Sequence, residues 1–130
     1  MARVLIVDDS VLIQGILKKV LEAAGHTIVG MAASGSEAVR MYGELKPDLV
    51  TLDIVMEDPE NKAVGNQSGI AALRDIREMD RKAIVVMVSS VKDPDVHKQA
   101  EDLGAAGFIV KAFKPEEVQQ AVVKALSKRI

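Results

Sequence analysis

The stretch RVLIVDDS at residues 3–10 decides the fold, because it joins an apolar, β-branched run to two acidic residues and a serine. Residues 3–7 predict a short buried strand, and the apolar residues after it recur at helical spacing until Gly25. Those apolar residues are Val11, Ile16, Leu17, Val20, Leu21 and Ala24. The stretch therefore predicts a strand–helix unit with Asp8 and Asp9 at the carboxyl end of its strand.

The same alternation of strand and helix patterns recurs along the rest of the chain. Further strands are predicted at residues 27–32, 49–52, 83–88 and 108–110. Further helices are predicted at residues 36–45 with Ser36 as the cap, 94–103 with Asp93 as the cap, and 115–128. This alternation predicts an α/β fold whose parallel sheet is covered by two helices on one face and three on the other.

Composition supports one folded domain and excludes several classes of partner. The chain has 130 residues, 48% hydrophobic and only 2% aromatic, so we expect a single domain with an aliphatic core. A net charge of -2 provides no basic surface for nucleic acid, and none is expected as a partner. The apolar runs are far shorter than the ~20 residues that span a bilayer, and no signal segment precedes the first strand. We therefore expect a cytoplasmic protein without membrane insertion.

Residues suited to phosphoryl chemistry follow the predicted strands. They are Asp8, Asp9, Asp53, Ser89 and Lys111. The carboxyl ends of parallel strands share one edge of a sheet, so these residues are expected to converge there. A carboxylate can attack phosphorus if the surrounding negative charge is neutralised, which makes Asp53 the candidate nucleophile. Mg²⁺ prefers hard oxygen ligands, and Asp9 and Asp53 fit that preference with Asp8 close by.

Each of these residues also has a simpler explanation when taken alone. Asp9 and Ser10 could form a turn or a helix cap, Ser89 and Ser90 could lead into a helix, and Lys111 could be an exposed lysine. Coincidence explains the complete set poorly, because acids, a hydroxyl and an ammonium all follow the appropriate strands.

Three other signals are weak. The run Ser34-Gly35-Ser36 fits a turn and cap better than a phosphate-binding loop. His26 and His97 are isolated in sequence and are expected to face solvent. No functional role is assigned to any of them.

Four motifs resemble the receiver domain of two-component response regulators, in particular the stand-alone chemotaxis regulators of the CheY type. They are VDDS at residues 7–10, PDLVTLD at 47–53, Ser89, and GAAGFIVK at 104–111. The resemblance covers nearly the whole chain and implies a single receiver domain over residues 1–130. It also implies a flavodoxin-like (βα)5 doubly wound sandwich, with the strand order 2-1-3-4-5 for which CheY is a standard example.

The resemblance implies a phosphorylation cycle centred on Asp53. A histidine kinase would donate the phosphoryl group, with Mg²⁺ as cofactor and Mn²⁺ as a substitute. The backbone carbonyl of Val55 would complete the protein ligands, and Asp8 would act mostly through water. Lys111 and the Ser89 hydroxyl would contact phosphoryl oxygens. Such a protein catalyses its own phosphorylation and dephosphorylation and is not a conventional turnover enzyme.

The resemblance also implies a switch and a set of partners. Ser89 and Phe108 would move on phosphorylation and change the surface of the fourth helix, fifth strand and fifth helix. That surface would include Lys92, Lys98, Lys114 and Gln119. Because no output domain follows residue 130, we expect a monomer that binds a separate target, such as a flagellar motor switch component. A phosphatase is a further expected partner.

The chain departs from the family pattern after the nucleophile. Met56 is followed by Glu57 and a polar stretch before Gly69, which indicates an inserted loop at about residues 57–68. Such a loop is tolerated cheaply, because closure entropy rises slowly with length. The alternative is a mobile flap in which Glu57, Asp58 or Glu60 affects metal binding, donor access or partner choice.

Two substitutions relative to the family pattern carry further expectations. Ala112 stands where the family commonly has a proline with a cis bond, so a trans or strained Lys111–Ala112 bond is expected. Val55 and Val91 match positions that flank the phosphoryl group. Apolar side chains there would exclude water and lengthen the phosphorylated lifetime.

Several other functions are open or disfavoured. A phosphorelay intermediate or phosphate sink is an open alternative, and partner assays separate it from a target-binding switch. A phosphorylation-independent receiver-like binding module is disfavoured by the intact acidic set. A haloacid-dehalogenase-type phosphatase would need a second acid where Ser10 stands, and the acidic pair would repel a flavin phosphate.

Overall fold

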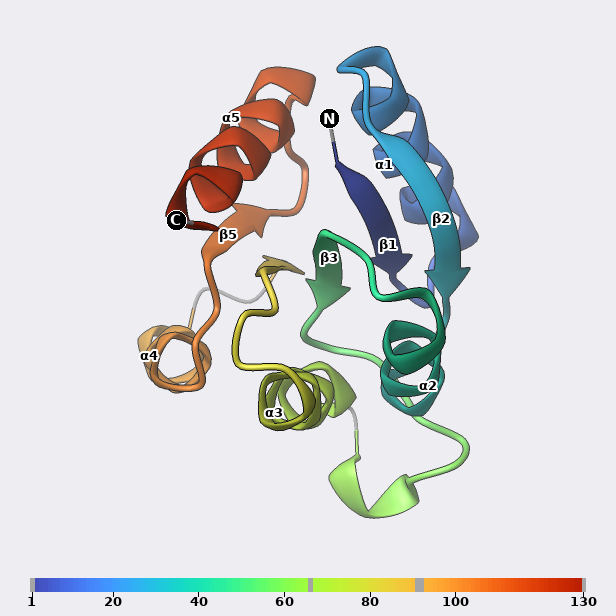
Figure 1. The fold of residues 1–130 in the computed structure, drawn as a ribbon. Coiled ribbons are helices and arrows are strands. Elements are labelled where there is room, and N and C mark those ends of the chain that lie inside the picture. Colours follow the sequence, from blue (N-terminus) through green and yellow to red (C-terminus); the bar gives the residue numbers. More distant parts are fainter. Residues whose placement is uncertain (1, 66, 91–92, 130) are drawn as a thin grey trace.

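The computed structural model describes residues 2–65, 67–90 and 93–129, and these form a five-stranded parallel sheet with helices on both faces (Figure 1). The strand order is β2-β1-β3-β4-β5, so the predicted flavodoxin-like order is confirmed. The strands are β1 (Arg3–Val7), β2 (Thr27–Ala32), β3 (Leu49–Asp53), β4 (Val85–Ser89) and β5 (Gly107–Val110). The α-helices are α1 (Val11–Ala23), α2 (Gly35–Leu45), α3 (Ser68–Met79), α4 (Pro94–Asp102) and α5 (Pro115–Leu126).

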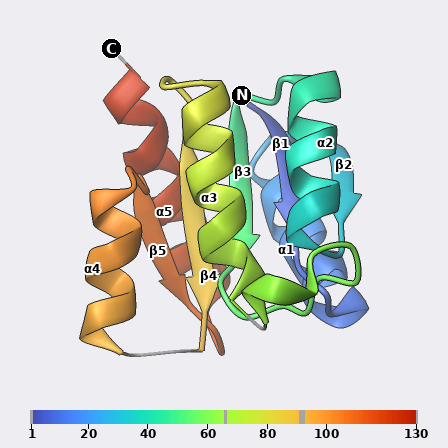
Figure 2. The ribbon, with the colours of Figure 1, turned by 90° about the horizontal axis from the view of Figure 1, so that it is seen from below.

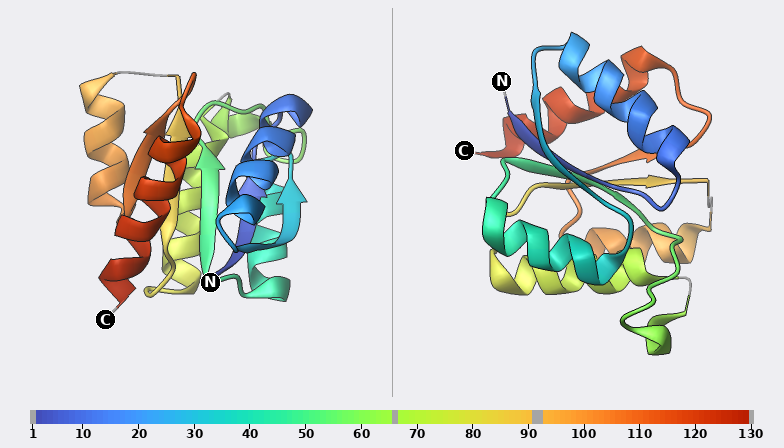
Figure 3. Two further views of the ribbon diagram at one scale, coloured as in Figure 1. Left: turned by 90° about the horizontal axis from the view of Figure 1, so that it is seen from above. Right: turned by 90° about the vertical axis from the view of Figure 1, so that its right-hand side faces the viewer.

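The helices divide two to three between the faces of the sheet, as the alternation predicted. Figure 3 shows α1 and α5 on one face and α2, α3 and α4 on the other. Along β1, Val4 and Ile6 pack toward α1 and α5, whereas Leu5 and Val7 pack toward the other three helices. Central strands that are buried on both faces explain the continuous aliphatic runs in the sequence.

The register of the sheet places the carboxyl ends of the strands together at one edge (Figure 2). Asp53 pairs with Val88 across β3 and β4, and Ser89 pairs with Val110 across β4 and β5. The Lys111 backbone N–H then donates to the Ser89 carbonyl over 2.9 Å. Backbone hydrogen bonds of the sheet therefore fix the relative positions of the predicted site residues.

Several element boundaries differ from the sequence prediction by one or two residues, among them the starts of α2 and β4. Helix α2 is capped by Ser34, whose hydroxyl accepts from Glu37 N–H over 3.2 Å, and not by Ser36. Strand β4 begins at Val85 and extends through Ser89, although the apolar pattern placed its start two residues earlier. The caps of α1 and α4 follow the sequence, because Ser10 and Asp93 each accept a backbone N–H of the first turn.

The inserted segment is fastened to α2. The Asp58 carboxylate is buried and accepts from the Ser36 N–H at 2.8 Å and the Ser36 hydroxyl at 2.7 Å. Glu60 pairs with Arg40 of α2 at 3.1 Å. Asp58 and Glu60 thus both contact α2 in this structure, and the flap hypothesis for Glu57, Asp58 and Glu60 stays a prediction.

The rest of this segment forms a short 3₁₀ turn, Lys62–Val64, before α3 begins. The Ser68 hydroxyl donates to the Met56 carbonyl over 2.9 Å and closes the segment at its far end. Figure 1 shows the segment projecting beyond the face that α2 and α3 cover. Among the helices of the described residues, none is long and apolar enough to cross a membrane.

Candidate functional site

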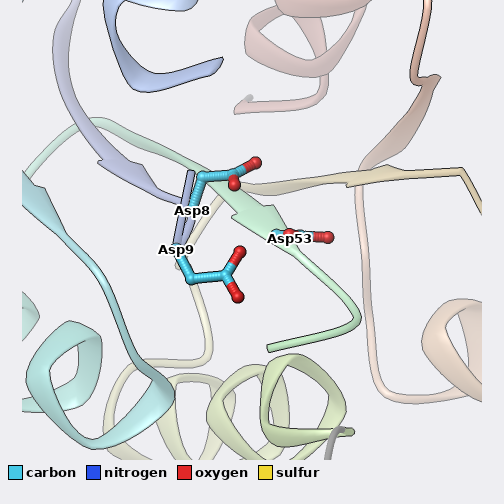
Figure 4. Close-up of side chains that lie close together, drawn as sticks. All are labelled: Asp8, Asp9 and Asp53. Carbon is cyan, nitrogen blue, oxygen red and sulfur yellow. The ribbon is translucent and has the colours of Figure 1, made fainter. Parts of the chain in front are cut away.

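Three carboxylates gather at the carboxyl edge of the sheet (Figure 4). One oxygen each from Asp8, Asp9 and Asp53 lies within 4.8 Å of the others. Asp8 and Asp53 are almost completely buried, with 0% and 2% of their surface exposed, whereas Asp9 is exposed. The predicted acidic cluster is thus formed by the turn after β1 and by the last residue of β3.

Backbone hydrogen bonds hold the acidic turn after β1. The Asp8 N–H donates to the Ala32 carbonyl at 3.0 Å, and Asp8 Oδ1 accepts from the Ser10 N–H at 2.9 Å. Gln14 of α1 donates from Nε2 to the carbonyls of Asp8 at 2.7 Å and Ala32 at 3.2 Å. Sequence reasoning missed Gln14, although it is the one polar side chain among residues 11–17 and was therefore a usable signal.

Lys111 brings a positive charge to the two buried acids. Its Nζ lies 3.0 Å from Asp53 Oδ2 and 3.2 Å from Asp8 Oδ2, and about a fifth of its side chain, 21%, is exposed. The Lys111–Ala112 bond is trans, since the described chain has no cis peptide bond. Ala112 instead has a φ of 63°, in the left-handed region that costs a non-glycine residue about 1 kcal/mol.

Burial and neighbouring charges have opposing effects on the pKa values of Asp53 and Lys111. Burial, reinforced by the Asp8 charge, raises the pKa of Asp53 to about 6, although the Lys111 hydrogen bond opposes the rise. Burial alone would lower the pKa of Lys111, but the hydrogen bond and charges of Asp53 and Asp8 outweigh it and raise that pKa. At neutral pH the site therefore holds an ionised nucleophile beside a charged ammonium.

The residues of the site fit a hard divalent cation. Asp8 Oδ2 is buried, and its partner within the described part of the chain is the Lys111 ammonium 3.2 Å away, so it keeps a lone pair for a cation or a bound water. Asp9 supplies an exposed carboxylate and Asp53 a third. Mg²⁺ binds through one or two carboxylates while keeping several waters, which suits this arrangement. The role of the Val55 carbonyl stays a prediction.

Ser89 lies beside this cluster at the end of β4. It is buried, with 5% exposure, and its carbonyl is bonded to Lys111, the residue that pairs with Asp53. On the other side, the Ile54 N–H donates to the Val88 carbonyl at 3.3 Å. The structure thus brings all five predicted site residues to one edge of the sheet.

Both histidines are more buried than expected, and His97 contacts the predicted switch residue, Phe108. His97 of α4 is half-buried and stacks on Phe108 of β5, with ring centroids 4.5 Å apart. His26 is also half-buried, and its Nδ1 accepts from the Ala2 N–H at 3.0 Å. The expectation that both histidines face solvent is therefore wrong.

The predicted switch surface is only partly described. Lys98 and Lys114 are exposed, and Gln119 is half-buried with its amide 3.5 Å from the Val20 carbonyl. Val91 and Lys92, to which the sequence assigned roles in water exclusion and partner binding, lie outside the described residues.

Comparison with known proteins gives the same family along most of the chain. Residues 4–123 match the response regulator receiver domain. Protein CcdB of Bacillus subtilis is 40% identical over 97% of this chain and 98% of its own length. Chemotaxis protein CheY of Thermotoga maritima is 40% identical over 94% of this chain and 95% of its own length.

A solved structure supports the match at the level of the fold. The CheX–CheY–BeF3–Mg²⁺ complex from Borrelia burgdorferi contains a chain that is 36% identical, with a TM-score of 0.84. The alignment covers 93% of this chain and 86% of that one. Receiver domains bind Mg²⁺ at an aspartate cluster, which here corresponds to Asp8, Asp9 and Asp53. The fold, the acidic site and these matches show that the chain belongs to the receiver-domain family of two-component response regulators.

Proposed function

We propose that this protein is a stand-alone response regulator that accepts a phosphoryl group on Asp53 and thereby changes its affinity for a separate target protein. The observation that supports this most directly is the placement of a buried Asp53 carboxylate beside two further acids and 3.0 Å from Lys111 Nζ. A histidine kinase is the phosphodonor that a receiver domain implies.

The chemical step is an in-line transfer between two nucleophiles. An Asp53 carboxylate oxygen attacks phosphorus and forms an acyl phosphate, while the bond from phosphorus to the donor imidazole nitrogen breaks. The electron pair leaves with the imidazole, which takes up a proton. Mg²⁺, when bound by the aspartates, neutralises charge on the phosphoryl oxygens. Lys111 moves from Asp53 to those oxygens, and the Ser89 hydroxyl donates to another.

Hydrolysis of the acyl phosphate restores Asp53, and an apolar neighbour slows it. Val55 follows the nucleophile by two residues and leaves 37% of its surface exposed. An apolar side chain there cannot orient an attacking water, so a long phosphorylated lifetime is expected. A polar residue in its place, such as Val55→Asn, is expected to shorten the acyl-phosphate half-life.

An apolar patch on α1 suits docking of the kinase. Val11, Leu12 and Ile16 are 81%, 71% and 39% exposed, and Lys18 and Lys19 lie beside them. Val11 follows Asp9 by only two residues, so the patch adjoins the acidic cluster. A donor that presents phosphohistidine to Asp53 must cover this rim, which makes its phosphohistidine domain the occupant we assign to the patch.

The target binds on the surface formed by α4, β5 and α5. Identity of 40% to a chemotaxis protein favours a chemotaxis target such as a flagellar motor switch component. We further propose that the regulator acts as a monomer in the cytoplasm. The Borrelia burgdorferi CheY is found in complex with CheX, which supports a second partner, such as a phosphatase, for this chain.

Intact-mass measurement with acetyl phosphate tests the phosphoryl chemistry. A single adduct that requires Mg²⁺ and is lost in Asp53→Ala is expected. Lys111→Ala, which leaves all three carboxylates in place, should slow adduct formation without changing its position. Absence of any adduct on the unmodified chain would reject the proposal in favour of a phosphorylation-independent binding module.

A further inference from the structure

The contact between His97 and Phe108 joins α4 to β5 near the predicted switch. The two rings are almost parallel, with an interplanar angle of 6° and centroids 4.5 Å apart. Both side chains are half-buried, and Phe108 also packs against the core that lies under α2, α3 and α4. Aromatic pairs at such separations have a defined geometry and a favourable energy, so this stack selects one orientation of Phe108.

Phe108 also borders a groove on the surface. Phe108 lines a groove of about 580 Å³ between α4 and α5, together with Glu101, Ala105 and Glu117. The Phe108 ring therefore contacts His97 and also borders this groove.

Ser89 connects this pair to the phosphorylation site by two routes. Its carbonyl binds the Lys111 N–H, and Lys111 follows Phe108 by three residues along β5. In the other direction, α4 begins at Pro94, five residues after Ser89, and carries His97 in its first turn. Ser89 is therefore one backbone hydrogen bond from the residue that directly follows β5 and five residues from the start of α4.

We propose that His97 is a positioning residue that holds Phe108 in its resting orientation, so that phosphorylation must break the stack before the α4–β5–α5 surface changes. The inference rests on the proposed function, since it names a regulatory residue of the same switch. The observed stack belongs to the resting form, because Lys111 pairs with the unmodified Asp53 carboxylate in the same structure. Loss of the imidazole is expected to shift the population toward the active orientation by about two- to tenfold.

The composition of the chain makes Phe108 easy to observe. The chain contains only two phenylalanines, Phe108 and Phe113, so a protein labelled with fluorophenylalanine gives two ¹⁹F signals. Phe113→Leu identifies the Phe108 signal by elimination. The variants to compare are His97→Ala, which removes the ring, and His97→Tyr, which keeps an aromatic ring. Lys98→Ala is the matched control, because Lys98 is exposed on the same helix.

The Phe108 signal and the affinity for beryllium fluoride with Mg²⁺ are measured for each variant. We expect His97→Ala to move the resting Phe108 signal toward its beryllium-fluoride position and to bind beryllium fluoride about two- to tenfold more tightly. His97→Tyr should restore both values, and Lys98→Ala should change neither. A Phe108 signal and affinity in His97→Ala that match the unmodified protein would overturn the inference. The proposed function is tested separately, because it is rejected if acetyl phosphate gives no adduct. In that case the ¹⁹F signals of the unphosphorylated variants still show whether His97 holds the orientation of Phe108.

Discussion

Replacing Gly69 by alanine is expected to force α3 away from the strand that carries the nucleophile. Gly69 is the second residue of α3, and its N–H donates to the Ile54 carbonyl over 3.2 Å. A Cβ on Gly69 would lie 2.0 Å from the Asp53 carbonyl oxygen and 2.6 Å from Ile54 Cα, whereas ordinary contact begins near 3.4 Å. All of these neighbours are backbone atoms, so a side-chain rotation cannot relieve the clash.

The loss of stability in Gly69→Ala depends on whether β3 or α3 moves to relieve the clash. β3 is paired on both sides, with β1 and β4, so α3 must shift by more than 1 Å and loosen its contacts through Leu73 and Ile76. Overpacking of this kind costs about 3 kcal/mol of unfolding free energy. Gly15 is the matched control because it lies in α1 with no atom within 4 Å of its missing Cβ. Gly15→Ala should stabilise the protein by about 0.5–1 kcal/mol through helix propensity.

Urea denaturation of the two variants beside the unmodified protein measures both effects, with the m-values checked for constancy. Acetyl phosphate should also phosphorylate Gly69→Ala more slowly, under conditions where this variant is folded. The reason is that the added Cβ pushes against the backbone of Asp53, the residue that carries the nucleophile. Equal stability of Gly69→Ala and Gly15→Ala would refute the steric reasoning.

Three further predictions concern charge, anchoring and docking. Without Mg²⁺, Asp53→Asn should be more stable than the unmodified protein by about 1–2 kcal/mol at neutral pH, because burial of the Asp53 charge is relieved. The pKa of Asp53 is about 6 in the folded protein and 3.8 in the unfolded one, so the unmodified protein loses stability as pH rises through that interval. In urea titrations the stability difference between Asp53→Asn and the unmodified protein should therefore vanish near pH 4. A difference that is the same at pH 4 and pH 7 contradicts this prediction. Asp58→Ala should cost about 2 kcal/mol at neutral pH, because the two Ser36 donors lose their acceptor. Burial would raise the pKa of Asp58, but its hydrogen bonds from Ser36, Glu60 and Asn61 outweigh burial and lower the pKa below 3.8. The stability that Asp58 contributes is therefore present above about pH 4 and is lost on acidification. If thermal melts of Asp58→Ala and the unmodified protein differ by the same amount at low and neutral pH, the Asp58–Ser36 contact does not stabilise the fold in this way. Leu12→Glu should slow phosphotransfer from the kinase about tenfold and leave acetyl phosphate reactivity unchanged; equal slowing with both donors would remove α1 as the docking surface.

The sequence predicts best what depends on local pattern. The strands, their order and the convergence of Asp8, Asp53 and Lys111 at one edge follow from alternation, family motifs and the geometry of parallel sheets. A trans bond before Ala112 was also expected, from the absence of proline.

Contacts between distant residues are what local pattern leaves out. Asp58 binds Ser36, which lies 22 residues earlier, and no periodicity in the inserted segment indicates that partner. His97 looks solvent-facing in a polar helix, yet β5 places Phe108 beneath it. The cap of α2 could not be predicted for a similar reason. Two serines flank Gly35, and only the backbone angles in the structure show that Ser34 and not Ser36 is the cap.

The fastening of the inserted segment at both ends has a practical consequence. Its tip around Lys62 is exposed and stands out from the α2 and α3 face. The chain lacks cysteine, so a single cysteine introduced at Lys62 would accept a dye or a surface linker at one position only. A receiver tethered there keeps its α4–β5–α5 surface, which lies on the opposite side of the molecule, uncovered (Figure 2). This makes the turn a ready attachment point for an immobilised sensor of target binding.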